Sequence, residues 1–272
     1  FKLLLTISYK ILRMLAMSSF IKFLGTAGGR YVVARQLRAS GGTYISANGQ
    51  NIMLDPGPGA LVKCAKSKPS IDATALNAII LSHLHIDHSN DVNILIDAIT
   101  GGGHRKGGVL FAPKEALEGD DAVVFKYLRN FLEDIVVLEA ERNYKIGDIE
   151  FSTSIKHQHT AETYGIKFNI NGHNISFIAD TRFFPELIDS YKGSDMLIVN
   201  VVSHTLPEKI NIKHLCLDDV KEIIKEVKPS KAVITHFGMT MLKAKPWVLA
   251  EQLSNELGIE VIAASDGMTI EL

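Results

Sequence analysis

The chain has 272 residues, of which 46% are hydrophobic and 22% are charged, and its formal net charge at pH 7 is −1. This composition is that of a globular protein with a sizeable buried core. The balanced charge excludes a global electrostatic attraction to nucleic acid or to an anionic membrane surface, so any affinity for anions must be local.

The first segment, FKLLLTISYKILRMLAMSSF, is apolar but broken by three basic residues. It is therefore no uninterrupted membrane span of about 20 apolar residues. A signal peptide that ends near MLAMSS is one interpretation. We favour an N-terminal extension over residues 1–16 that forms an amphipathic helix, because Met17 directly precedes a good first strand, SFIKFLG. Residues 17–272 are then expected to form one domain.

Short runs rich in β-branched and aromatic residues recur along the whole chain and end in Gly, Asp, Asn or His, which is typical of strands. In order they are FIKFLG, TYISANG, NIMLDPG, AIILSH, GVLFAP, IVVLEA, IEFSTSI, YGIKFNI, ISFIAD, MLIVNVV, AVITHFG and IEVIAASDG. Asn171-Gly172, between two of these runs, predicts a hairpin with a tight turn. Apolar residues at helical spacing predict helices over residues 91–100, 217–227 and 246–257.

The order of these elements indicates the fold class. Early strands cluster with few helices between them, and later strands alternate with helices. We therefore predict an α/β fold of two sheets packed face to face with helices outside, without an internal repeat or a linker.

The chain contains two cysteines, Cys64 and Cys216, far apart and in no CxxC arrangement. A disulfide scaffold is not expected, and reduced thiols in a cytoplasmic protein fit better. Each cysteine is expected to be a small buried side chain.

The stretch ILSHLHIDHSND, residues 80–91, gathers His83, His85, Asp87 and His88 directly after an apolar run. Imidazoles and carboxylates this close repel one another when charged and are costly to bury unpaired, whereas a bound cation reverses that cost. His83 and His85 are two apart on an extended segment, so both can point at one ion. The alternative interpretation is a polar loop that happens to be rich in histidine.

The sequence HLHIDH, residues 83–88, resembles the HxHxDH signature of the metallo-β-lactamase superfamily. Asp55, in the preceding LDPGPG, resembles that superfamily's earlier strand-end motif. The superfamily pattern then requires a histidine, an aspartate and a histidine, each after a strand, and the chain offers His159, Asp180 and His236. The resemblance extends from about residue 20 to the end of the chain and is strongest to the phosphodiesterase and tRNA-end ribonuclease branch.

One of these assignments has a competitor. His157 lies in the same segment, KHQHTAETYG, as His159. We prefer His159 because it stands six residues before Gly165, at the start of a strand, a spacing similar to that of the family's ribonucleases and phosphodiesterases.

The resemblance implies a four-layer αββα sandwich with a binuclear metal site. Zn²⁺ is expected, with Mn²⁺ or Fe as alternatives, because neutral imidazoles suit zinc and a carboxylate can bridge two ions. The implied activity is hydrolysis by a metal-bridged hydroxide, since two close dications lower the pKa of a shared water and hold the attacked group. The resemblance assigns His83, His85 and His159 to one ion, Asp87 (also counted as catalytic), His88 and His236 to the other, and Asp180 to the bridge.

Four further residues have two interpretations each. His214 resembles the histidine that donates a proton to the leaving oxygen in the family's phosphodiesterases, and the alternative is a solvated side chain beside a helix. Asp55 and Asp266 stand where strands turn, so they either orient metal-bound histidines or only form turns. For His204 we favour a polar strand end over a role in the site.

The substrate is expected to be a small anionic phosphodiester or a nucleic-acid end. Arg30, Arg35 and Arg38 follow GTAGG, which lacks the Lys-Ser/Thr ending of a P-loop, and are available to contact an anion from the loop after the first strand. Arg105 and Lys106 are expected to add to the positive charge that faces the substrate. The alternatives are a lactone or β-lactam substrate and, less favoured, a non-catalytic metal-binding sensor. No membrane partner is expected, and the resemblance leaves a homodimer open.

Overall fold

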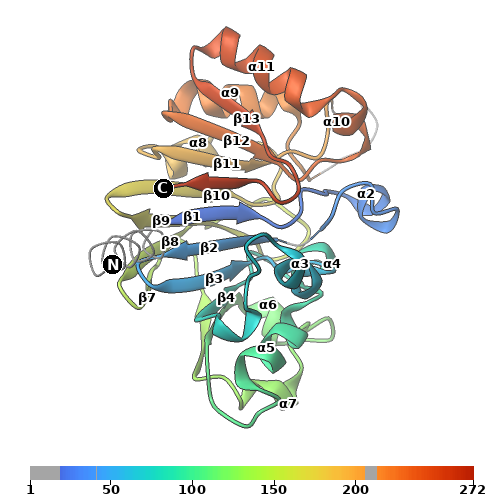
Figure 1. Ribbon diagram of the computed structural model, residues 1–272. Coiled ribbons are helices and arrows are strands. Elements are labelled where there is room, and N and C mark those ends of the chain that lie inside the picture. Colours follow the sequence, from blue (N-terminus) through green and yellow to red (C-terminus); the bar gives the residue numbers. More distant parts are fainter. Residues whose placement is uncertain (1–18, 41, 206–212) are drawn as a thin grey trace, which may run out of the picture.

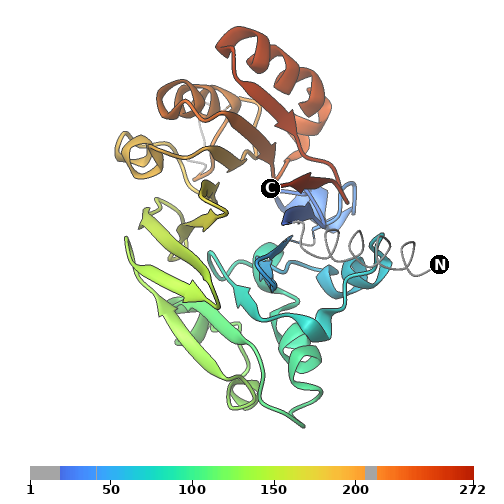
Figure 2. The ribbon, with the colours of Figure 1, turned by 60° about the vertical axis from the view of Figure 1, so that its left-hand side comes forward.

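The computed structural model describes residues 19–40, 42–205 and 213–272. Within them, two mixed sheets of seven strands each face one another, with helices on the outer sides (Figures 1 and 2). This confirms the predicted α/β fold and the implied four-layer sandwich. The extension expected over residues 1–16 lies outside the described residues.

The first sheet has the strand order β14-β1-β2-β3-β4-β5-β6. Its antiparallel part joins β14 to β1, β1 to β2 and β2 to β3, and the remaining pairs are parallel. The carboxyl ends of β3, β4 and β5 therefore meet at one edge. The strands are β1 (Phe20–Phe23), β2 (Thr43–Ala47), β3 (Gln50–Leu54), β4 (Ala78–Ile80), β5 (Val109–Pro113), β6 (Asp134–Leu138) and β14 (Thr269–Glu271).

The second sheet has the order β13-β12-β11-β10-β9-β8-β7. Strands β10 to β13 are parallel, so the segments that follow them also meet at one edge. The predicted turn at Asn171-Gly172 joins antiparallel β9 and β10, and both residues have positive φ angles, as a type I′ turn requires. The strands are β7 (Asn143–Ile146), β8 (Ile149–Lys156), β9 (Tyr164–Ile170), β10 (His173–Ile178), β11 (Met196–Asn200), β12 (Lys231–Thr235) and β13 (Glu260–Ala263).

The predicted helices correspond to α5 (Val92–Thr100), α9 (Leu217–Val227) and α11 (Pro246–Leu257). No helix among the residues described is both long enough and apolar enough to cross a membrane. Shorter helices were not predicted because they span two turns or fewer and show little periodicity. They are α2 (Arg30–Ala34), α3 (Ala60–Lys66), α4 (Ile86–Ser89), α6 (Lys114–Leu117), α7 (Lys126–Arg129), α8 (Glu186–Tyr191) and α10 (Met239–Lys243), with a 3₁₀ turn, η1 (Ala73–Ala75).

Three apolar cores hold the layers together. One lies between the sheets and includes Ile45, Phe151 and Phe168. A second packs α3 and α5 against the outer face of the first sheet, and a third packs α8, α9 and α11 against the second sheet. Strands β7 and β14 were missed in the sequence because each is short and mostly exposed.

Candidate metal centre

The predicted ligands meet at the edge where the parallel strands of both sheets end. His83 follows β4, His85 immediately precedes α4, Asp180 follows β10 and His236 follows β12. The approach of β1's loop to His236 requires a glycine, because a Cβ on Gly28 would lie 2.1 Å from the His236 carbonyl oxygen.

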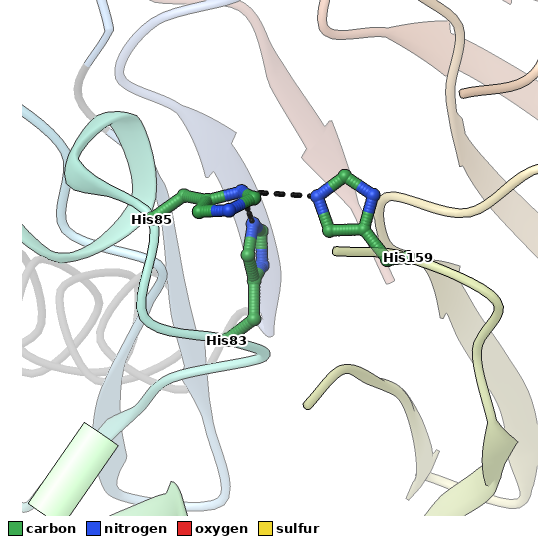
Figure 3. Close-up of side chains that lie close together, drawn as sticks. All are labelled: His83, His85 and His159. Atoms are coloured by element: carbon green, nitrogen blue, oxygen red, sulfur yellow. Dashed lines mark hydrogen bonds between the residues drawn. The ribbon is translucent and has the colours of Figure 1, made fainter. Parts of the chain in front are cut away.

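Three imidazoles form a first triad (Figure 3). The Nδ1 atom of His85 lies 3.1 Å from Nε2 of His83 and 3.0 Å from Nε2 of His159. The His85 ring meets each of the other two edge-on. Three ring nitrogens from segments far apart in the chain thus converge on one point, within the distances at which they could hold one metal ion.

Each ring has an inner nitrogen, which faces the other rings of the triad, and an outer nitrogen, which faces away. The partners of the outer nitrogens show which inner nitrogens carry lone pairs. His159 Nδ1 faces the backbone oxygen of Lys213 at 2.9 Å, and this carbonyl can only accept. Ser82 Oγ donates to Asp55 Oδ2 at 2.6 Å, so it accepts from Nδ1 of His83 at 3.0 Å. In the neutral rings of His83 and His159, the inner nitrogen is therefore unprotonated. Two lone pairs therefore point toward Nδ1 of His85, where either a proton on that atom or a bound cation can hold the three rings together.

Asp87, His88 and His236 form a second triad. The Asp87 carboxylate oxygen Oδ2 lies 3.8 Å from Nε2 of His88 and 3.7 Å from Nε2 of His236. His88 is oriented from behind by Asp55, whose Oδ2 is 3.0 Å from Nδ1 of the ring. Both inner nitrogens are buried without a hydrogen-bond partner among the described residues. Because a buried polar atom is normally paired, these two nitrogens fit metal coordination.

Asp180 lies between the two triads. Its Oδ2 atom is 4.0 Å from Nε2 of His83 and 3.4 Å from Nε2 of His88. Its Oδ1 atom is 3.4 Å from Nε2 of His236 and accepts a hydrogen bond from the Asn200 amide at 2.9 Å. A carboxylate that contacts both groups is well placed to face two ions at once.

The pKa of His88 in the second triad shifts in the opposite direction to the pKa values of the three histidines in the first triad. Burial lowers the pKa of His83, His85 and His159, so these rings are neutral and able to ligate. Burial acts on His88 in the same direction, but Asp87 and Asp180 outweigh it and hold the pKa of His88 well above its usual range. Positive charge therefore stabilises the second triad, and a bound cation can supply that charge in place of a proton.

His214 joins the centre, as one of its two interpretations requires. Its Nδ1 atom lies 3.4 Å from Asp180 Oδ2, and its ring meets that of His159 edge-on at 4.9 Å between centroids. The side chain is 25% exposed, so it borders the solvent side of the site. Burial lowers the pKa of His214.

His157 lies outside both triads. Its Nε2 atom is 2.8 Å from the Tyr191 hydroxyl, and its Nδ1 is 3.3 Å from the Asp180 carbonyl oxygen. Both ring nitrogens are thus engaged within the protein, and burial lowers the pKa of His157 to about 4. The geometry favours His159 over His157 as the ligand.

Asp55 and Asp266 differ in what they hold. Asp55 hydrogen-bonds the backbone of Ser82 and the ring of His88, so it orients the centre. Asp266 accepts from the backbone and hydroxyl of Thr26 and from the backbone of Ala39, so it fixes the ends of the loop that contains α2.

His204 enters none of the metal-binding groups formed by the described residues. The expectation for Arg105 and Lys106 is wrong. Their loop precedes β5, and Arg105 bonds the carbonyl oxygens of Ile99 and Thr74, at the end of the parallel strands away from the ligands.

Several residues that support the centre were missed in the sequence. Ser82, Asn200 and the Lys213 backbone oxygen contact predicted ligands from outside, as does Thr160, whose hydroxyl is 3.2 Å from Nε2 of His85. Ser82 and Thr160 each adjoin a predicted ligand in the chain, which was the available signal. A backbone oxygen leaves no such signal.

The part of the chain that contains the predicted ligands matches a known family. The pattern of a family described as a beta-lactamase superfamily domain matches residues 50–237. "Uncharacterized protein MJ1374" of Methanocaldococcus jannaschii is 36% identical over 261 residues, which cover 93% of this chain and 94% of that protein. A ribonuclease Z of Borrelia garinii subsp. bavariensis is 22% identical, with 92% and 96% covered.

Two solved structures share the fold. The metallo-beta-lactamase fold protein YhfI from Bacillus subtilis superposes with a TM-score of 0.78 at 19% identity, over 94% of this chain and 100% of that one. A diphosphatase from the PhnP family gives a TM-score of 0.69 at 20% identity, over 94% and 98%. These likenesses confirm the architecture.

Proposed function

The chain belongs to the beta-lactamase superfamily, and on that premise we propose that it is a hydrolase that uses two divalent metal ions, in the first place Zn²⁺, to cleave a phosphodiester. The single observation that carries this proposal is the convergence of histidine ring nitrogens and carboxylates in two adjoining triads, in which the inner nitrogens of His88 and His236 are buried without a hydrogen-bond partner among the described residues. We assign His83, His85 and His159 to one ion, Asp87, His88 and His236 to the other, and Asp180 to both. The ions would supply an acidic water and positive charge at the attacked phosphoryl group.

The charge of the loaded centre supports an anionic substrate. Two carboxylates, Asp87 and Asp180, would oppose two dications, so positive charge remains in excess. That excess favours an anion in the ground state and the charge that builds on the phosphoryl oxygens during attack. The name of the ribonuclease Z relative and that of the diphosphatase with the same fold agree with this choice.

Arg30, Arg35 and Arg38 support the same substrate class from the α2 loop, residues 29–39. None of the three pairs with a carboxylate among the described residues. Arg30 and Arg35 are exposed and Arg38 is partly so, which leaves them available to substrate oxygens.

Both ends of this loop lie against the second triad. At its start, Gly28 contacts the backbone of His236. At its end, Ser40 lies beside Gly57, whose missing Cβ would otherwise meet the Asp87 carbonyl oxygen at 2.1 Å. The loop that contains the three arginines is therefore anchored at the edge of the proposed metal site.

We assign His214 the role of proton donor to the leaving oxygen. It contacts Asp180 and His159 at the solvent side of the centre, where a leaving group would depart. An alkoxide needs such a proton more than an aryloxide does. His214→Ala should therefore impair hydrolysis of an alkyl diester far more than that of bis-p-nitrophenyl phosphate. Equal impairment would remove His214 from this role.

An activity panel tests the proposal. The purified chain, supplied with Zn²⁺ or Mn²⁺, is assayed against bis-p-nitrophenyl phosphate, a dinucleotide, a lactone and a β-lactam. We expect hydrolysis of the phosphodiesters. Brisk cleavage of the lactone or β-lactam with every phosphodiester untouched would replace this proposal with a carbonyl hydrolase, and no hydrolysis at all would favour a metal-binding sensor. The cytoplasmic location and the homodimer remain predictions from the sequence.

A further inference from the structure

A second pocket, the lysine pocket, lies on the outer face of the first sheet. It has a volume of 310 Å³ and is lined by Lys22 of β1, by residues at the end of α3 and just beyond it, and by the turn Asp266-Gly267. None of the predicted metal ligands lines it. It is therefore distinct from the metal centre.

Lys22 is the unusual residue of this pocket, because its side chain is only 7% exposed. Its neighbours Ile21 and Phe23 belong to the core between the sheets, so strand alternation turns Lys22 to the outer face. Its ammonium group donates to the Lys68 carbonyl oxygen at 3.2 Å and to the Thr269 hydroxyl at 3.4 Å. Neither partner is negatively charged. Since buried lysines are rarely left without an anion, Lys22 points to a missing one.

Three more lysines surround the same space. Lys63 and Lys66 lie in the last turn of α3, and Lys68 follows two residues later. Across the described chain, every lysine or arginine ion pair lies elsewhere. The dipole of α3 favours cations at its C-terminal end, which accounts for Lys63 and Lys66 but not for Lys22 on a strand.

Two further groups complete the pocket. The Ser67 hydroxyl is buried and has no hydrogen-bond partner among the residues described. Asp266 is the one carboxylate on the lining, and its oxygens already accept from Thr26 and Ala39 at 2.7 to 2.9 Å. It therefore offsets the four ammonium groups only in part, and the pocket keeps an excess of positive charge and a free donor.

We propose that the lysine pocket binds a small soluble anion with more than one phosphate charge, of the diphosphate class. Four lysines line the space from a strand, a helix end and a loop, and none offers the planar fork that an arginine offers to a carboxylate. Such compact charges from several directions suit the tetrahedral oxygens of phosphate groups. The Ser67 hydroxyl would donate to one of those oxygens. This proposal does not depend on the proposed hydrolase activity.

Isothermal titration of the metal-loaded full chain with pyrophosphate tests the proposal. Lys22→Met should weaken binding at this site by about tenfold or more, because a desolvated charged hydrogen bond is lost. Lys66→Ala combined with Lys68→Ala removes two exposed charges and should weaken binding by about two- to fivefold. Lys106→Ala, which removes one exposed charge from a residue that does not line the pocket, is the matched control and should leave binding unchanged.

The lysine variants also separate this site from the metal centre, which can bind pyrophosphate itself. Binding at the metal centre should persist in all the lysine variants, and the Lys66→Ala/Lys68→Ala variant should keep wild-type activity on any substrate found. A parallel titration with ADP distinguishes the two sources of a diphosphate, since tighter binding than pyrophosphate assigns a nucleotide and weaker binding a free anion. Identical isotherms for wild type, Lys22→Met and the double variant, or no site beyond the metal centre in wild type, would overturn the proposal.

Discussion

The metal centre and the lysine pocket each lack a charged partner, and the two missing charges have opposite signs. In the centre, imidazole nitrogens and carboxylates converge, and His88 and His236 each present a buried nitrogen that has no hydrogen-bond partner in the described part of the chain. In the pocket, three lysines line the same space as Lys22 and a buried Ser67 hydroxyl, and the one carboxylate on the lining already accepts hydrogen bonds. The difference lies in the chemistry of the missing group, a cation in one place and an anion in the other.

Unpaired buried polar atoms therefore locate ligand sites more directly than residue type does. His157 is as buried as His83 and His88, yet both its ring nitrogens have partners. His157 is therefore a reference within the same protein for a buried histidine whose ring nitrogens both have hydrogen-bond partners. Four predictions test this contrast.

The largest effect is expected from Asp180→Ala, because Asp180 contacts both triads. Its loss removes the carboxylate that would separate and hold two dications, so we expect loss of the paired metal site and a fall in phosphodiesterase activity of at least about a hundredfold. Metal analysis and initial rates measure both. A full metal complement in the variant would remove Asp180 from the bridging role.

The second prediction concerns His157, whose ring nitrogens both have partners within the protein. The pKa of His157 is about 4 in the folded chain, against 6.5 ordinarily. The unfolded chain thus binds more protons between these values, and stability must fall as pH drops from about 6.5 to about 4, by about 3 kcal/mol from this residue. Urea unfolding at pH 7 and pH 4.5 should show a smaller pH dependence for His157→Gln than for wild type.

The same variant tests the choice between the two histidines. His157→Gln should retain most activity at pH 7, because the ring contacts Tyr191 and a backbone oxygen and lies outside both triads. His159→Ala should abolish activity, because His159 supplies a nitrogen of the first triad. The reverse pattern of activities would show that the spacing from Gly165 selected the wrong residue.

The third prediction compares two carboxylates at strand ends. Asp55→Ala should lower metal affinity about 10- to 100-fold, because Asp55 orients His88 directly and His83 through Ser82. Asp266→Ala is the matched control, since Asp266 bonds Thr26 and Ala39 and no predicted ligand. Competition with a chromophoric chelator gives both affinities. Equal losses in the two variants would assign Asp55 a purely structural role.

The smallest effect is expected at Lys22. In phosphate-free buffer Lys22→Met should raise the free energy of unfolding by about 1 kcal/mol, because it removes a buried charge that no anion compensates. Added pyrophosphate should stabilise the wild type more than the variant, because the variant keeps only the metal centre as a strong site. Thermal unfolding in both buffers measures this. A variant less stable than wild type in phosphate-free buffer would show that Lys22 is already compensated.

Much of the fold and of the centre could be predicted from the sequence because their signals are local. Each predicted strand run forms a strand, and residues 83–88 present their ligand types within six positions. The other predicted ligands each stand within three residues after a strand, His236 directly after one, so their order was readable too.

The remainder depends on contacts between distant segments. The lysine pocket joins Lys22, residues 63–68 and Asp266, which no spacing rule connects. The support of His159 by a backbone oxygen depends on where the chain passes rather than on a side chain. Arg105 was misplaced because the sequence does not say that its loop precedes a parallel strand and so lies at the far end of the sheet.

The number of metal ions per chain tests the central claim most directly. Native mass spectrometry of the purified wild type, together with elemental analysis of the same sample, counts and identifies the ions without reference to a substrate. We predict two divalent transition-metal ions, in the first place zinc, and loss of phosphodiesterase activity when a chelator removes them. An active protein that holds one ion, or none, would contradict the assignment of the two triads.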